Sequence, residues 1–177
     1  MTVETMRQWQ GLYQGVVVSA VDESRAGLLQ VRVPEVLGAD VCVWAAPLTP
    51  LAGADCGMYV VPPTGAGVWV QFLDGDPDRP VWVGFWRGGP GDVPSAARSA
   101  DPGTPQIVLA TPSQSALVIS DQRGPAGGIR LQLDGENGPF IHLSNMSIEI
   151  SCGGPEGASI KLAGNQVIIN GGALMVQ

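Results

Sequence analysis

The second half of the chain is built from short runs in which large apolar residues occupy every second position. Eight such runs lie between residues 107 and 176, with Gly-Pro pairs among the turns that separate them. Alternation with a period of two is typical of strands that bury one face, and no segment here has the period of an amphipathic helix. This half therefore predicts a ladder of eight short strands. Its main apolar positions are Ile107, Leu109, Leu117, Ile119, Ile129, Leu131, Leu133, Ile141, Leu143, Ile148, Ile150, Ile160, Leu162, Val167, Ile169, Leu174 and Val176.

A single copy of this ladder cannot shield its apolar side from water. The region has too few large side chains to build a second layer, and exposed strand edges and apolar faces promote aggregation. Three copies that wrap around one axis would bring the apolar faces together in a finite, closed object. We therefore predict a triple-stranded β-helix, a β-prism formed by a homotrimer, in which strand edges pair with the other chains. A monomeric β-sandwich is the alternative.

The first half predicts a small β-barrel or sandwich. The 25 glycines and 15 prolines of the chain disfavour long helices. Short strand-like segments separated by turns are typical of such folds. We predict a lead-in over 1–10, a barrel domain over 11–90, a linker over 91–106 and a needle over 107–177. The expected barrel strands are 12–20, 28–33, 41–45, 58–61, 67–73 and 81–86.

Charge and cysteine content restrict the partners and the location. The net charge is -7 and Lys161 is the one lysine, whereas nucleic-acid binding depends on clustered basic residues. Cys42, Cys56 and Cys152 are odd in number and widely spaced, which favours free thiols over disulfides or a zinc site. Neither a signal peptide nor a membrane-spanning apolar run is visible, so we expect synthesis in the cytoplasm.

Three stretches of the first half resemble a known family. They are GLYQGVV at 11–17, GLLQVRVP at 27–34 and PPTGAGVWVQFLDGDPDRPVWVG at 62–84, with Val21-Asp22 and Val43-Trp44 between them. Together they resemble the OB-fold domain of phage baseplate assembly protein V and of VgrG spike proteins. The positions that carry the resemblance, all expected to be structural, are Gly15, Asp22, Gly27, Val31, Pro34, Trp44, Pro63, Gly65, Phe72, Asp74, Gly75, Asp76, Pro77, Arg79, Pro80 and Gly84.

The resemblance implies a structural spike protein at the centre of a contractile injection system: a phage tail, a tailocin or an extracellular injection system. It implies an all-β chain, an OB-fold barrel followed by a trimeric needle, assembled into the particle and touching a target membrane only on firing. About ten residues precede the barrel, where a VgrG carries a hub domain, so a separate hub protein is expected. We hypothesise that a PAAR-type tip protein covers the apolar end formed by Leu174, Met175 and Val176.

Other candidate sites favour structural interpretations. Asp74, Asp76 and Asp78 resemble half of a calcium loop, but Arg79 and Phe85 stand where calcium geometry needs Gly and Glu. A turn in which the Asp side chains bind nearby N–H groups is expected instead.

His142 alternates with apolar neighbours and should face outward into solvent. Histidine, serine and carboxylates show no catalytic pattern, so we predict no enzymatic activity, no metal and no cofactor.

The barrel aromatic residues suggest an alternative function. An OB-fold module can bind single-stranded nucleic acid on aromatic side chains, but it also needs a basic groove, which this composition lacks. We expect these residues to form barrel core and trimer contacts. They are Trp69, Phe72, Trp82, Phe85 and Trp86.

Overall fold

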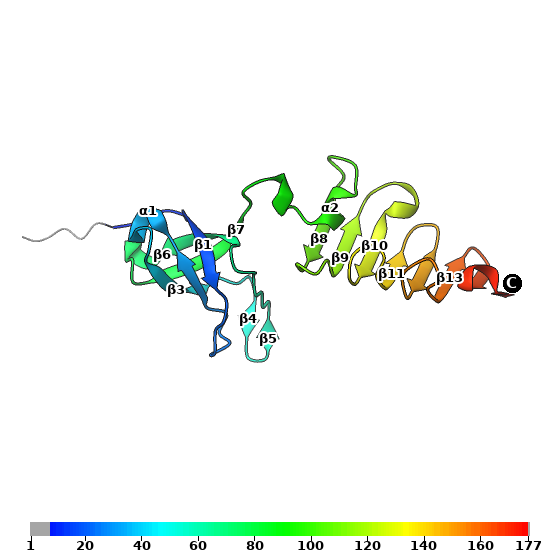
Figure 1. Ribbon diagram of the computed structural model, residues 1–177, viewed down its shortest axis with the longest axis horizontal. Helices are drawn as coiled ribbons and strands as arrows, with labels where there is room; N and C mark the ends of the chain where they lie inside the picture. Colours follow the sequence, from blue (N-terminus) through cyan, green and yellow to red (C-terminus); the bar gives the residue numbers. More distant parts are fainter. Residues whose placement is uncertain (1–7, 177) are drawn as a thin grey trace, which may run out of the picture. The chain divides into compact units, whose positions relative to one another are not determined.

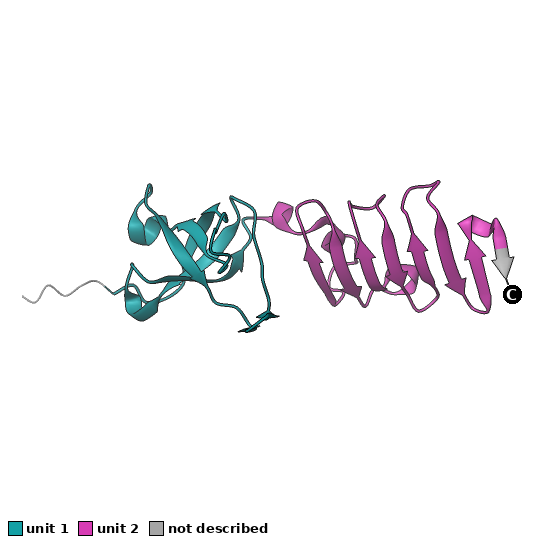
Figure 2. Ribbon diagram, turned by 90° about the horizontal axis from the view of Figure 1, so that it is seen from below, with its two compact units in different colours: residues 1–88 teal, residues 89–177 magenta. Residues whose placement is uncertain are grey.

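The computed structural model describes residues 8–176 and consists of strands joined by short turns, with two helical segments of a single α-turn each. It divides into two compact units, residues 1–88 and residues 89–177 (Figure 2). The predicted all-β class is confirmed, and each unit is described below by itself.

The first unit is a closed barrel of five strands (Figure 1). Neighbouring strands run antiparallel, except that β3 and β7 pair in parallel and close the barrel. A closed barrel leaves no strand edge open to aggregation. In barrel order the strands are β1 (Tyr13–Ser19), β2 (Leu29–Arg32), β3 (Cys42–Pro47), β7 (Pro80–Trp86) and β6 (Gly67–Phe72).

Valine dominates the core of the barrel. In β6, Val68, Val70 and Phe72 point inward while Gln71 between them is exposed, the alternation of a strand with one buried face. Branched side chains suit the pleated, half-buried surface of a strand. The buried core consists of Val17, Leu29, Val31, Val33, Ala45, Val68, Val70, Phe72 and Trp82.

Two features of this unit differ from the sequence prediction. Pro34–Leu37 form a one-turn helix, α1, directly after β2. The strand expected over Met58–Val61 is wrong, because those residues are exposed and unpaired in any sheet. The closed barrel has no free edge to receive them. A small hairpin precedes them instead, formed by β4 (Ala52–Gly53) and β5 (Cys56–Gly57).

The second unit is one eight-stranded sheet in which every strand pairs antiparallel with its neighbour in sequence. The prediction of eight strands is confirmed, but the predicted pairing with other chains is wrong. Turns of a few residues let each strand fold back on the one before it, so both edges of β9 to β14 are occupied within the chain. The strands are β8 (Gln106–Ala110), β9 (Ala116–Ser120), β10 (Gly128–Gln132), β11 (Phe140–Leu143), β12 (Ile148–Ser151), β13 (Ser159–Ala163), β14 (Gln166–Ile169) and β15 (Leu174–Val176).

Residues 91–106, predicted as a linker, cluster with the second unit. The helix α2 (Ser95–Arg98) lies within them, and the Gln106 side-chain amide donates a 2.8 Å hydrogen bond to the Ala97 carbonyl. The 3-10 turns of the chain are η1 (Leu73–Gly75), η2 (Pro90–Asp92), η3 (Gly124–Ala126) and η4 (Asn170–Gly172).

Candidate interaction surfaces

One face of the second unit carries two parallel columns of aliphatic side chains, which we call the apolar face. The sheet register places these residues directly opposite one another from strand to strand, so each column crosses the sheet without interruption. One column is Ile107, Ile119, Ile129, Leu143, Ile148, Leu162 and Val167. The other is Leu109, Leu117, Leu131, Ile141, Ile150, Ile160 and Ile169, and Leu174 of β15 continues it.

The burial of the two sheet faces is the reverse of that in an ordinary globular domain. Most residues of the apolar face are exposed; Ile107, for example, is 60% exposed. Between the two columns, and on the opposite face, runs a third column that includes charged residues, yet all of its members are half-buried. This column is Val108, Val118, Arg130, His142, Glu149, Lys161 and Ile168.

Charged groups on this opposite face are paired with neighbouring groups. Arg130 lies 3.9 Å above the Phe140 ring, and its Nε donates a 2.6 Å hydrogen bond to Gln132. Partial burial lowers the pKa of Arg130, and the charges of Glu149 and Glu136 oppose that shift. Lys161 and Glu149, opposite each other in the register, form an ion pair at 3.7 Å.

His142 lies on this face as predicted, but it is only partly exposed to solvent. Its Nε2 lies 3.0 Å from the Gly127 carbonyl oxygen, and the residue is half-buried. The turn that connects β9 to β10 provides this carbonyl. The β9–β10 connection thus covers the polar face at His142, while the apolar face is left open.

Exposure of the apolar face to water is unfavourable in free energy for a single chain, and burial of this face would favour association. Full burial of a Leu or Ile side chain is worth about 1.5–3 kcal/mol, so covering the remaining half of each contributes about 1 kcal/mol. Contiguous apolar surface of this extent marks an interaction site. No hydrogen-bonding or charged side chain interrupts either column, so the fitting partner surface is itself aliphatic.

The C-terminal edge of the sheet is β15, which has a neighbour on one side only. Leu174 is exposed there, in keeping with an apolar end. The side chains of Met175 and Val176, the other two predicted tip contacts, lie outside the described residues.

In the barrel, the DGDPDRP segment forms the tight connection between β6 and β7. Arg79 makes a 2.6 Å ion pair with Asp74, and Asp76 accepts a 2.9 Å hydrogen bond from the Asp78 backbone N–H. The turn prediction is confirmed for Asp76, whereas Asp74 binds the guanidinium group of Arg79. Gly75 is buried, with a positive φ of 74°, and Pro80 is buried at the start of β7.

A second cluster of predicted positions closes the loop between β1 and β2. The carboxylate of Asp22 accepts hydrogen bonds from the Ser24 hydroxyl at 2.6 Å and from the Leu28 N–H at 3.0 Å. These bonds lower the pKa of Asp22, chiefly through Ser24. The Gly27 carbonyl next to them accepts a 3.0 Å bond from the indole of the buried Trp82.

The remaining predicted positions lie in strands and turns. The Gly15 carbonyl accepts a 3.1 Å bond from the Trp86 indole, and Gly65 donates through its N–H to Val17. Trp44 is the exception, because it is 45% exposed on β3 and its side chain makes no hydrogen bond or ring contact with the other described residues.

The structure places the remaining positions as follows: Val31 and Phe72 in the core, Pro34 at the start of α1, Pro63 in the turn before β6, Pro77 in the turn before β7, and Gly84 in β7.

The aromatic residues do not form a stacking platform. Phe72 and Trp82 are core residues, so their rings are unavailable to a base. Trp69 and Trp86 are half-buried, and the Trp86 indole is occupied by backbone carbonyls. Phe85 is exposed and packs against Trp82 at 5.6 Å between ring centroids.

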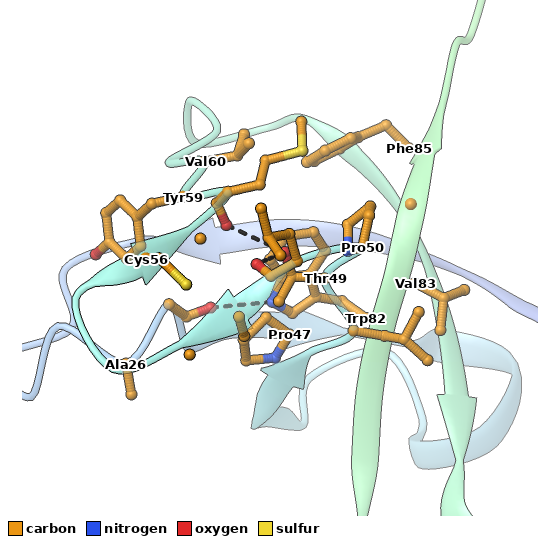
Figure 3. Close-up of a pocket in the computed structure, with 18 of the residues that line it drawn as sticks. Ala26, Pro47, Thr49, Pro50, Cys56, Tyr59, Val60, Trp82, Val83 and Phe85 are labelled. Carbon is orange, nitrogen blue, oxygen red and sulfur yellow. Dashed lines mark hydrogen bonds between the residues drawn. The ribbon is translucent and has the colours of Figure 1, made fainter.

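Sequence reasoning missed an apolar arm on the barrel, which we define as residues 48–61. It contains the β4–β5 hairpin, and between this arm and β7 lies an open cleft of about 520 Å³ (Figure 3). The floor includes Trp82, Phe85 and Pro47. The sequence does contain a cluster of large apolar residues here. We interpreted its first part as the loop after the strand over 41–45 and its last part, 58–61, as a strand.

Further features of the described residues concern metals, thiols and membranes. Residues 8–176 contain no cluster of His, Cys, Asp and Glu side chains arranged to hold a metal ion. Cys42, Cys56 and Cys152 are all free thiols. Within the same residues, no helix has the length and apolar character needed to cross a membrane.

Comparison with protein families matches both units. Residues 13–86 match the family model described as the Type VI secretion system/phage-baseplate injector OB domain. Residues 106–175 match the model described as the phage baseplate V C-terminal trimerisation domain. A comparison with curated proteins found no match. The two matched segments correspond to the barrel and to the sheet that carries the apolar face.

Proposed function

The chain belongs to the phage baseplate V family, in both its barrel and its C-terminal trimerisation domain, and on this premise we propose that it is the force-transmitting spike of a contractile injection machine. It is a structural, spike-type baseplate protein without enzymatic activity of its own. The proposal concerns what the spike does: the barrel attaches to a separate hub protein, and the needle helps to pierce the target envelope.

The apolar face carries this proposal. Three sheets that turn their aliphatic columns toward one axis would form a prism with a dry interior and polar outer faces. Each sheet is already hydrogen-bonded along its length, so bending the prism would break backbone bonds and unpack the axis together. A rod of this kind is suited to transmit an axial push.

The exposed end of the sheet supports a second part of the proposal. Leu174 and the unpaired edge of β15 leave apolar and backbone polar groups uncovered at the last strand. We propose that a PAAR-type tip protein covers this end.

Light scattering on the full chain tests the trimer on which the proposal depends. We expect about 55 kDa, three times the 18.3 kDa chain. A stable 18.3 kDa monomer at micromolar concentration would contradict the trimeric prism, and with it the proposed spike.

Piercing is tested with particles that carry the wild-type chain and vesicles of target envelope that enclose a protease. After sheath contraction, we expect the spike to be cleaved by the enclosed protease, while sheath subunits outside stay intact. A spike that stays intact in contracted particles would contradict piercing. Hub attachment is tested separately, by cross-linking purified particles and identifying what is bound to residues 8–88.

A further inference from the structure

The arm on the barrel, residues 48–61, is almost entirely uncovered. Every residue from Leu51 to Val61 is exposed, including Met58 and Tyr59, of which Tyr59 is 61% exposed. Figure 1 shows β4 and β5 projecting from the barrel as a hairpin. Its hydrogen bonds outside the β4–β5 pairing are few. At its base the Leu48 N–H donates to the Trp82 carbonyl, the Met58 N–H donates to the Leu51 carbonyl, and the Thr49 hydroxyl donates to the Met58 and Leu51 carbonyls.

Such an arm is poorly supported by its own barrel. An exposed two-stranded hairpin is at best marginally stable in water, and exposure of its large apolar side chains to water is unfavourable. We therefore expect another protein surface to cover the arm in the assembled protein.

The cleft between the arm and β7 has complementary chemistry. Asp55 is the one charged residue among those that line it, and its floor includes Trp82, Phe85 and Pro47. In Figure 3 the side chains of Tyr59, Val60 and Phe85 are drawn around this space. The arm itself forms most of the lining of this recess, so the arm of a second barrel that entered it would pack between the first arm and β7.

A protrusion and a recess on one subunit are what a head-to-tail interface requires. Around a three-fold axis, three such contacts close into a ring. The C-terminal trimerisation domain tethers three barrels to one another, which raises their mutual effective concentration and allows a contact of modest affinity to form.

We propose that the arm of one barrel packs into the Trp82–Phe85 cleft of the next barrel in the trimer, so that the barrels form a second interface between copies of this chain. This inference rests on the proposed trimer, but it concerns a separate surface. It assigns the arm to a copy of the same chain and not to the hub protein.

Photo-cross-linking of the full chain tests the contact. Tyr59 is replaced by p-benzoylphenylalanine, the molar mass of the sample is measured, and the irradiated protein is run on a denaturing gel. On this gel only covalent links between copies give bands heavier than one chain. We expect two-chain and three-chain species, and peptide analysis should map the links to residues 80–86. The same photo-reactive residue at Val21, which is 78% exposed and lies outside the arm, is the control and should give single chains.

A second variant tests the recess. Phe85→Asp places a charge in the apolar floor and should reduce the multi-chain species about tenfold, the factor that corresponds to 1.4 kcal/mol. The molar mass should stay that of a trimer. Three outcomes would overturn this inference and leave the trimeric spike intact: a trimer that gives no multi-chain species, links that map away from residues 80–86, or links that form only to an added hub protein. A monomeric sample overturns both.

Discussion

Ile150 on β12 lies directly opposite Ile160 on β13, and both side chains are about half exposed although each sits in the middle of a strand. Their neighbour on the other face, Glu149, is less exposed than either, although it is charged. The same arrangement recurs along most of the apolar face. Most of the large aliphatic side chains of the second unit lie on the face that the single chain leaves uncovered.

A charge on the apolar face should abolish trimer formation. Ile150→Asp would place three carboxylates around the dry axis, and burial of unpaired charges costs several kcal/mol for each. We expect the molar mass measured by light scattering to fall from about 55 kDa to that of the 18.3 kDa chain.

Ser151→Asp is the matched control for this variant. It adds the same charge one residue away on the opposite face, where Asp can still accept the 3.0 Å bond that Ser151 receives from the Gly153 N–H. This variant should stay trimeric, and a trimeric Ile150→Asp would show that the apolar face is not the interface.

Asp22 should make the stability of the barrel depend on pH in the acid range. Its pKa is lowered in the folded state, so its contribution is present above the unfolded value of 3.8 and is lost as the pH falls through the folded value below that. Asp22→Asn should therefore unfold more easily than the wild type at pH 7, and the difference should shrink below pH 3.8.

Tryptophan fluorescence measures this effect in the barrel alone, because all five tryptophans lie in residues 1–88. Asp78→Asn, in an exposed turn position, is the control and should show no such difference. A gap between wild type and Asp22→Asn that stays constant down to pH 2 would contradict the assignment.

The indole of Trp82 should stabilise the barrel through its hydrogen bond to Gly27. Trp82→Phe keeps an aromatic ring in the core but leaves the Gly27 carbonyl without its donor, which costs about 1–3 kcal/mol. Urea unfolding followed by circular dichroism measures this loss. Trp44→Phe, at an exposed position, should change the free energy of unfolding by less than about 0.5 kcal/mol. Equal losses in the two variants would argue against the bond.

Gly128 should tolerate no side chain, in contrast to Gly154. Both have positive φ, 109° and 70°, which disfavours any other residue. A Cβ at Gly128 would also collide with the Leu143 carbonyl of the neighbouring strand, whereas one at Gly154 would meet no atom. Gly128→Ala should therefore lower the melting temperature of the second unit more than Gly154→Ala. Similar melting temperatures would mean that only the backbone strain matters.

The sequence determined the strands of the second unit, because a period of two in apolar residues has one structural solution at that length. It also determined the barrel turns: glycines at positive φ, such as Gly75, and an Asp that accepts a neighbouring N–H are encoded locally. The resemblance carried by residues 62–84 pointed to the correct family, since the motif is long and its turn residues are specific.

The tertiary structure alone decided which groups meet across the chain. Alternation cannot reveal whether a strand pairs with its own neighbour or with another copy, and the observed register shows pairing within the chain. It cannot reveal that a turn folds over His142, nor that Met58–Val61 find every barrel edge occupied and remain in an exposed arm. Pairing and burial depend on contacts between segments distant in sequence, whereas strand period and turn chemistry depend on a few adjacent residues.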